Sequence, residues 1–276
     1  VEKNRAVGVR LASGEEFRAP AIVSDAGAAN TFAKLLPREI AKKSGLLQKL
    51  ETVPTSIAYV CLYVGLDGTA EEIGLPKTNF WIYPDEKHDQ NYERAVSDLN
   101  APFPVVYISF PSAKDPTFTK RYPGKSTVEI ITAVPYEFFS KWEGTKWRKR
   151  GEDYETLKAK LSERLLEKLY GKLPQTRGKV AYHELSTPLS VQHFSNYAKG
   201  ETYGLSHGPE RFTQNFLRVR TPVDGLYLTG QDLVTCGVTA ALMGGVFTAG
   251  VIGGMGLLRD VMAGAPAPQG VSRAAA

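Results

Sequence analysis

The sequence lacks several short motifs typical of disulfide, metal and nucleotide sites. Its two cysteines, Cys61 and Cys236, show no CxxC or Cys/His spacing. This excludes a disulfide framework and a zinc site of the usual spacing, and it indicates a reducing compartment. There is no GxxxxGK[ST] segment, which excludes a phosphate loop for nucleoside triphosphates. GxGxxG is also missing, so the usual grip on a dinucleotide pyrophosphate is not present.

The N-terminus shows no Met and no basic-then-apolar leader, because the chain begins Val-Glu-Lys-Asn and enters a strand-like segment almost at once. We therefore expect a fragment or a processed chain. With 42% hydrophobic and 23% charged residues, the composition is that of a folded soluble protein. A net charge of +5 is mild for 276 residues, and alone it is weak evidence for an anionic partner.

The two ends of the chain share one pattern, an apolar strand followed by small residues and a helix. Residues 5–18 predict a hairpin around a turn at 12–14, and residues 21–26 predict a strand buried on both faces. Residues 28–50 predict a helical region broken at Pro37. Residues 178–185 and 225–230 predict a return to strands near the other end.

The middle of the chain reads differently. Four strand-like runs at 56–66, 79–84, 104–110 and 126–134 alternate with polar and proline-rich connections and predict a separate, antiparallel sheet. Its aromatic residues are equally suited to a sheet core and to the wall of a long apolar tunnel. They are Tyr59, Tyr63, Phe80, Trp81, Tyr83, Tyr107 and Phe110. Residues 136–171 predict a helical region, with Leu157, Leu161, Leu165 and Leu169 on one covered face.

We therefore expect an α/β chain, α+β overall, in which an antiparallel sheet with helices is inserted into a domain formed by both ends. The expected boundaries are 1–50 and 181–262 for the end domain, 51–180 for the inserted domain, and 263–276 for a disordered tail rich in Ala, Gly and Pro.

Residues 141–172 combine a net charge of +4 with two tryptophans. A solvated amphipathic helix explains this composition. A membrane-surface contact explains it too, with Trp142 and Trp147 as interfacial anchors beside the basic run at 146–150. No nucleic-acid motif accompanies the charge, so we expect no nucleic-acid partner.

The uncharged run at 237–258 is long enough to cross a membrane. Its glycines weaken that interpretation, and the strand leading directly into it favours a buried helix of a soluble domain. Small residues recur four apart and predict a ridge on which a backbone or a flat ligand lies closely. They are Gly237, Ala241, Gly245, Ala249 and Gly253.

The stretch GLYLTGQDLVTCGVTAALMGG, residues 225–245, predicts a strand-to-helix corner. Amides at a helix N-terminus attract a phosphate or an acceptor that gains negative charge, and Gly237 leaves them accessible. Asp232 lies at the carboxyl end of the strand, where sugar hydroxyls bind in α/β sheets.

This stretch resembles the C-terminal flavin motif of the family of phytoene desaturases, carotenoid isomerases and retinol saturases. Residues 184–212 resemble the segment just before that motif, and residues 8–37 resemble mid-chain strands of the family. The resemblance implies the C-terminal part of a Rossmann-like FAD-binding domain with an inserted substrate domain. It also implies an FAD-dependent oxidoreductase that saturates, desaturates or isomerises a polyene, with NAD(P)H as a candidate electron donor.

The resemblance further implies roles for individual residues. Gly230, Asp232, Gly237, Val238 and Thr239 would bind the cofactor, with Asp232 on the ribityl or diphosphate part of FAD. The amides of Gly237 and Val238 would face the flavin, where reduced flavin gains negative charge.

Three residues of the segment before the motif, His193, Phe194 and Tyr203, would line the substrate site. His193 and Tyr203 are also candidates for moving protons, although no side chain is identified as catalytic. We expect no metal site. Cys236 is interpreted as a small residue buried beside the cofactor, with a reactive thiol or a covalent flavin anchor as the alternative.

Family members carry GxGxxG in an N-terminal unit, and this chain does not. We therefore expect a missing N-terminal half, on the same or a separate chain, and an isolated chain that is inactive and binds FAD weakly. The expected substrate is an apolar small molecule, and the expected location is cytoplasmic, at a membrane surface. A flavin oxidase of the amine oxidase type and a non-enzymatic carrier of apolar ligands are the alternatives.

Overall fold

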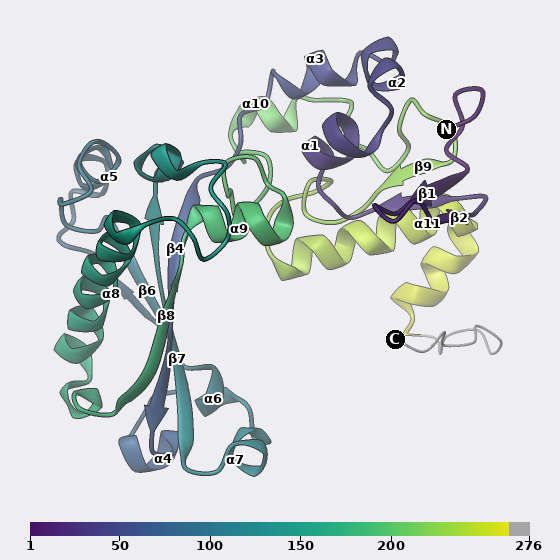
Figure 1. The fold of residues 1–276 in the computed structure, drawn as a ribbon. Helices are drawn as coiled ribbons and strands as arrows, with labels where there is room; N and C mark the ends of the chain where they lie inside the picture. Colours follow the sequence, from purple (N-terminus) through teal and green to yellow (C-terminus); the bar gives the residue numbers. More distant parts are fainter. Residues whose placement is uncertain (265–276) are drawn as a thin grey trace. The chain divides into compact units, whose positions relative to one another are not determined.

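The computed structural model describes residues 1–264, which form two compact units. Both ends of the chain build the first unit, Val1–Ser56 with the described residues from Tyr203 onward, and the middle, Ile57–Thr202, builds the second. Mixed α/β structure with an antiparallel sheet is confirmed (Figure 1). The predicted disordered tail lies outside the described residues from 265 onward.

The second unit is built on a five-stranded antiparallel sheet of order β5-β6-β7-β4-β8. Its strands are β4 (Ala58–Asp67), β5 (Phe80–Ile82), β6 (Val106–Ser109), β7 (Lys125–Val134) and β8 (Val180–Ser186). The two central strands pair along their whole length, from Ala58 opposite Val134 to Asp67 opposite Lys125. Buried and less buried residues alternate along both, as expected for strands with one face on a core.

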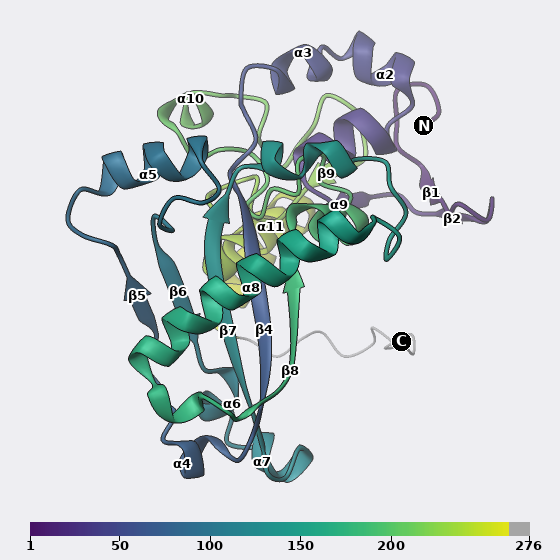
Figure 2. The same ribbon diagram turned by 60° about the vertical axis from the view of Figure 1, so that its left-hand side comes forward.

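Helix α8 (Glu152–Lys172) covers one face of this sheet (Figure 2). Leu161, Leu165 and Leu169 of the predicted apolar face are buried, and Leu157 packs at the edge of the same core. Acidic residues in the first turn and Lys172 in the last match the helix dipole. Shorter helices complete the unit: α4 (Ala70–Ile73), α5 (His88–Ser97), α6 (Pro111–Lys114), α7 (Phe118–Arg121), η2 (Tyr136–Trp142), η3 (Pro174–Thr176) and α9 (Pro188–Ser195).

Two predictions for the second unit are wrong. The helical region does not run continuously from 136 to 171, because η2 ends at Trp142 and a loop with left-handed turns at Gly144, Arg148 and Gly151 precedes α8. The boundary predicted at 180/181 is also displaced. β8 pairs with β4 and therefore belongs to the sheet of the second unit, not to the domain formed by the chain ends.

The first unit contains the predicted hairpin and a short parallel pair of strands. Strand β1 (Gly8–Arg10) pairs with β2 (Glu16–Arg18), and β3 (Ile22–Ser24) runs parallel to β9 (Leu226–Leu228). The helical region at 28–50 is broken at Pro37, as predicted, and again at Gly45. The helices of this unit are α1 (Ala28–Asn30), the π-helix η1 (Thr31–Leu35), α2 (Arg38–Lys43), α3 (Leu46–Leu50), α10 (Pro209–Phe212) and α11 (Val238–Met262).

Strand β3 is not buried on both faces, contrary to the prediction, because the Val23 side chain is 48% exposed. Its only strand partner among the described residues is β9, so one edge of β3 is unpaired. A hollow of about 770 Å³ lies beside it, lined by β1, β2, β3 and the end of η1.

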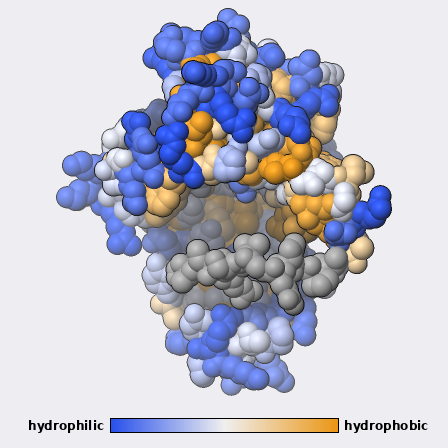
Figure 3. All heavy atoms as spheres, turned by 90° about the vertical axis from the view of Figure 1, so that its right-hand side faces the viewer, coloured by the Kyte–Doolittle hydropathy of each residue, from blue (hydrophilic) through white to orange (hydrophobic). Residues whose placement is uncertain are grey.

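Helix α11 is the one helix of the described chain long and apolar enough to cross a membrane. The prediction of a buried helix is wrong for the chain as described, because only 11% of the most apolar stretch of α11 is buried. Exposed apolar side chains such as Leu242 and Met255 lie along it. Figure 3 shows hydrophobic surface on the side where α11 and the β1–β2 hairpin lie. Gly254, at φ 84°, interrupts the helical geometry and divides α11 into two helical parts.

Candidate functional site

The predicted corner is formed where β9 turns into α11, and two glycines let the segments approach closely. Gly230 has φ 86°, a left-handed conformation, and a Cβ there would lie 1.8 Å from Oδ1 of Asp25. On α11, a Cβ at Gly244 would lie 2.6 Å from the carbonyl oxygen of Gly230. The backbone of α11 therefore rests directly on the corner, an approach that only glycine at position 244 permits.

The ridge that packs α11 is adjacent to the predicted one. The buried residues of the helix are Ala240, Gly244 and Thr248, spaced four apart, and Thr248 Oγ1 lies 2.9 Å from the carbonyl oxygen of Leu228. Of the predicted ridge, Gly245 faces open space, since a Cβ there would meet nothing within 4 Å. The period of four was correct, but which of the small residues face the sheet was not.

The N-terminus of α11 is open. Gly237 is its N-cap with φ 92°, no side chain caps the helix, and a Cβ at Gly237 would meet nothing within 4 Å. Val238 is 88% exposed and Thr239 is exposed as well. The amides of a long helix thus face an accessible space, which fits a ligand group that carries or gains negative charge. Cys236, expected to be buried, is exposed in the described chain.

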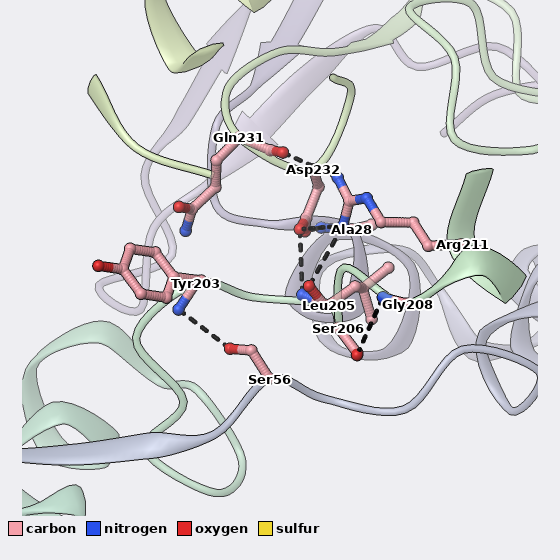
Figure 4. A network of polar contacts seen from close by, with 9 residues as sticks. All are labelled: Ala28, Ser56, Tyr203, Leu205, Ser206, Gly208, Arg211, Gln231 and Asp232. Atoms are coloured by element: carbon pink, nitrogen blue, oxygen red, sulfur yellow. Dashed lines mark hydrogen bonds and ion pairs between the residues drawn. The ribbon is translucent and has the colours of Figure 1, made fainter. Parts of the chain in front are cut away.

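Asp232 is buried, with 2% of its surface exposed, and its carboxylate is engaged within the chain. Oδ2 accepts the amide of Ala28 at 2.7 Å, and Oδ1 accepts the amide of Leu205 at 3.2 Å. Nη1 of Arg211 lies 3.5 Å from Oδ1, and both side chains of this ion pair are almost fully buried (Figure 4). Asp232 therefore ties the start of α1 and the 203–211 segment to the corner.

Arg211 and Tyr203 lie on the same segment. Arg211 Nη2 donates to the carbonyl of Gln231 at 2.8 Å, which adds a second tie to the corner. The Tyr203 amide donates to Ser56 Oγ at 3.1 Å, and its ring points away from the Asp232 carboxylate (Figure 4). Nearby His207 has a buried Nε2, and burial, followed by the charge of Arg211, lowers its pKa.

His193 and Phe194 lie together in the second unit, at the end of α9. Their rings form a cluster with Trp147, which lies in the loop between η2 and α8. Trp147 and His193 stack with centroids 5.0 Å apart and an interplanar angle of 6°. Phe194 meets both rings edge-on at 4.9 Å. The helix is set by Pro188 at its first position and a capping box between Thr187 and Ser190.

The predicted aromatic wall divides between the two faces of the sheet. Phe80 and Phe110 pack against each other in the core. Trp81, Tyr107, Ile131 and Cys61 follow one another across the strands on the face opposite α8, where side chains are half-buried or exposed. Burial raises the pKa of the Cys61 thiol to about 11, and burial followed by the neighbouring Cys61 raises the pKa of Tyr63 to about 12.

The sequence interpretation missed Arg211 and Gly244. Arg211 had a signal, a charged residue in the quoted segment 184–212, but its partner Asp232 could not be read from spacing. Gly244 was one of many glycines in the run. Among the described residues there is no group of three or more His, Cys, Asp or Glu side chains that could hold a metal ion.

The chain is similar to several curated proteins. It is 35% identical over 261 residues to an all-trans-retinol 13,14-reductase of Danio rerio, covering 91% of this chain. A second protein from that species, an inactive all-trans-retinol 13,14-reductase, is 33% identical over 264 residues and also covers 91% of the chain. The chloroplastic prolycopene isomerase of Arabidopsis thaliana is 28% identical over 253 residues, covering 90%.

The chain spans less than half the length of these relatives: 43% of each of the two Danio rerio proteins and 39% of the isomerase. No protein-family model matches it. The resemblance to the group of retinol saturases and carotenoid isomerases, inferred above from residues 8–37, 184–212 and 225–245, is confirmed by these similarities.

Proposed function

We propose that this chain, a homologue of retinol 13,14-reductases and prolycopene isomerases along nine-tenths of its length, is the C-terminal part of an FAD-dependent oxidoreductase that acts on carbon–carbon double bonds of a polyene. The observation that carries the proposal is the 35% identity with the Danio rerio reductase over nearly the whole chain. Its first unit would be the C-terminal part of a Rossmann-like FAD-binding domain, and its second the substrate domain.

The open end of α11 supports the assignment of the cofactor site. The amides at Gly237, Val238 and Thr239 would hold the part of the flavin that gains negative charge, and Gly230 would let the helix lie against the corner. When bound, FAD would supply the two-electron chemistry at the double bond. Because both oxygens of Asp232 already have partners in the chain, we assign this residue a positioning role and no direct contact with the ligand.

Two surfaces of the chain support the proposals of an apolar substrate and of a missing N-terminal half. The sheet face bearing Trp81, Tyr107, Ile131 and Cys61 would carry the polyene. The unpaired edge of β3 and the hollow beside it would receive an N-terminal half bearing GxGxxG, since parallel strands are normally buried within larger sheets. We propose that the protein is cytoplasmic and lies at a membrane surface. The names of the relatives give no support to NAD(P)H as the electron donor.

The test uses the longer protein of which this chain would be the C-terminal part. We expect the purified protein to show the absorption spectrum of bound flavin and to convert all-trans-retinol or prolycopene. Chromatography of the products measures the conversion. Peroxide release with amines and no polyene conversion would instead indicate an oxidase of the amine oxidase type. Flavin-free protein that binds retinol without converting it would support a carrier, an alternative favoured by the inactive relative.

Val238→Pro in the longer protein tests the helix end directly. Proline is well tolerated at the first helical position, so α11 should form, but the Val238 amide donor is lost. We expect FAD affinity to fall by roughly ten-fold or more, the effect of losing one hydrogen bond to a charged group. Val238→Ala keeps the amide and is the control; equal affinities in the two variants would contradict the assignment.

A further inference from the structure

The second unit presents an aromatic and basic surface that flavin chemistry does not require. It consists of Trp147, His193 and Phe194 with the cations Lys146, Arg148 and Lys149, and we call it the aromatic–basic patch. Phe194 is 71% exposed, although its neighbours Trp147 and His193 hold it in a defined position. A large apolar side chain is therefore fixed in solvent beside three positive charges.

The loop that carries Trp147 and the three cations is anchored to α8 and α9. Arg150 donates to the carbonyl of Leu189 at 3.3 Å and lies 5.5 Å from the Trp147 ring and 5.2 Å from the Tyr154 ring. This half-buried residue joins the loop to α9 and α8 and is therefore not one of the outer cations. The buried Trp142 donates to Asp153 at 3.1 Å and closes the base of the loop. Of the two tryptophans predicted as interfacial anchors, only Trp147 is placed to be one.

The outer cations of the loop are not neutralised by the protein. Lys146, Arg148 and Lys149 are exposed and form no ion pair with any described residue. Lysines at the margin of this region differ, since Lys141 pairs with Asp153 at 2.8 Å and Lys199 with Glu137 at 3.5 Å. Positive charge therefore remains where the exposed aromatic side chains lie.

We propose that the aromatic–basic patch docks this protein on an anionic bilayer surface, with Phe194 and Trp147 entering the headgroup region and Lys146, Arg148 and Lys149 contacting acidic lipids. Aromatic rings beside unpaired cations suit an interface that is apolar below and negatively charged above. The Trp147 and His193 rings already stack on each other, so they are poor platforms for nucleic-acid bases. The inference rests on the membrane location that is part of the proposed function and names the surface responsible, but it does not depend on the catalytic chemistry and needs only the second unit.

The test is co-sedimentation of the 276-residue chain with phosphatidylcholine vesicles, with and without phosphatidylserine, at low and physiological salt. We expect stronger binding to the anionic vesicles and weakening by salt. Lys146→Gln/Lys149→Gln should weaken binding by about 25-fold, at about five-fold for each basic residue. Phe194→Ser should weaken it by roughly ten-fold.

Matched variants separate the patch from the rest of the surface. Lys168→Gln/Lys172→Gln changes net charge equally on the exposed side of α8, and Phe212→Ser removes another ring, 62% exposed; both should bind like the parent. Leu242→Ser/Met255→Ser tests the exposed face of α11 and should leave the preference for anionic lipid unchanged.

The proposal is overturned if binding ignores phosphatidylserine, if the α8 pair weakens it as much as the loop pair, or if the α11 pair alone abolishes it. Loop-dependent binding to single-stranded RNA without vesicle binding would likewise overturn it and indicate a nucleic-acid partner. Because these measurements contain no flavin or polyene, their outcome is independent of the proposed catalytic function.

Discussion

Asp232 and Arg211 form the most deeply buried ion pair of the described chain, with side chains 3% and 2% exposed. A charge at this depth requires its partner, because the desolvation cost of the remaining ion is large. The pair also organises the backbone, since Asp232 accepts two amides and Arg211 donates to two carbonyls. The corner thus depends on charge pairing as well as on glycine.

Asp232→Asn should destabilise the protein by about 3–5 kcal/mol, because the guanidinium of Arg211 would remain buried without a counter-charge. The free energy of unfolding from denaturant titration gives the value. Glu16→Gln is the control, since its pair with Arg10 is exposed and should contribute at most about 1 kcal/mol. Similar losses in the two variants would mean that the buried pair has no special weight.

The two cysteines should differ in reactivity. Burial raises the pKa of Cys61 to about 11, whereas Cys236 is exposed just before α11. Since the thiolate is the reactive form, we expect iodoacetamide at mildly alkaline pH to modify Cys236 about 100-fold faster than Cys61. Peptide mass spectrometry over time measures both rates. Raising the pH towards 11 should accelerate the modification of Cys61. Equal rates for the two cysteines at mildly alkaline pH would contradict the protected position of Cys61.

At the scale of elements, the contact between α11 and the corner depends on the absence of a side chain at Gly244. Gly244→Ala would place a Cβ 2.6 Å from the Gly230 carbonyl oxygen, which belongs to backbone and cannot move away cheaply. We expect a loss of roughly 1–3 kcal/mol from overpacking. At Gly245 the same change meets open space and should stabilise the helix by up to about 1 kcal/mol. The melting temperatures of the two variants measure these effects. If Gly244→Ala and Gly245→Ala shifted the melting temperature in the same direction, this packing would be contradicted.

The elements themselves were largely predictable, and their partners were not. Alternation along β4 and β7 and the leucine repeat of α8 are local properties of the sequence, and the structure reproduces both. The position of β8 was not predictable, because residues 180–186 have the apolar character of a strand in either unit and only pairing with β4 decides. The ridge on α11 failed for the same reason: Ala240, Gly244 and Thr248 are selected by the corner they touch.

Within the candidate site, the sequence predicted the open helix end, because a glycine N-cap before a long uncharged run is a local pattern. It did not predict that Asp232 is occupied internally, since Ala28, Leu205 and Arg211 are distant in sequence. It placed His193 and Tyr203 in one stretch, yet they belong to different units. Contacts between distant residues are what a single sequence does not reveal.

At the scale of the whole molecule, the two units differ in how they depend on the chain. Ile57–Thr202 is continuous and encloses a hydrophobic core of sheet and α8 residues, from Val60 and Leu62 to Leu165 and Leu169. The first unit needs both ends of the chain, because β3 pairs with β9 and Asp232 holds Ala28. Continuity makes the second unit a candidate for independent folding.

The excised polypeptide 57–202 should therefore fold and unfold cooperatively, since its sheet order and core lie within the segment. Coincident transitions by circular dichroism and tryptophan fluorescence in denaturant would show this. Residues 1–56 and 203–264 expressed separately are the contrasting sample: each supplies one strand of the β3–β9 pair, so neither should show a cooperative transition alone. Leu165→Ala within 57–202 should lower its stability by about 2–5 kcal/mol if the core is the one described. A non-cooperative 57–202 segment would mean that the middle of the chain requires the first unit to fold.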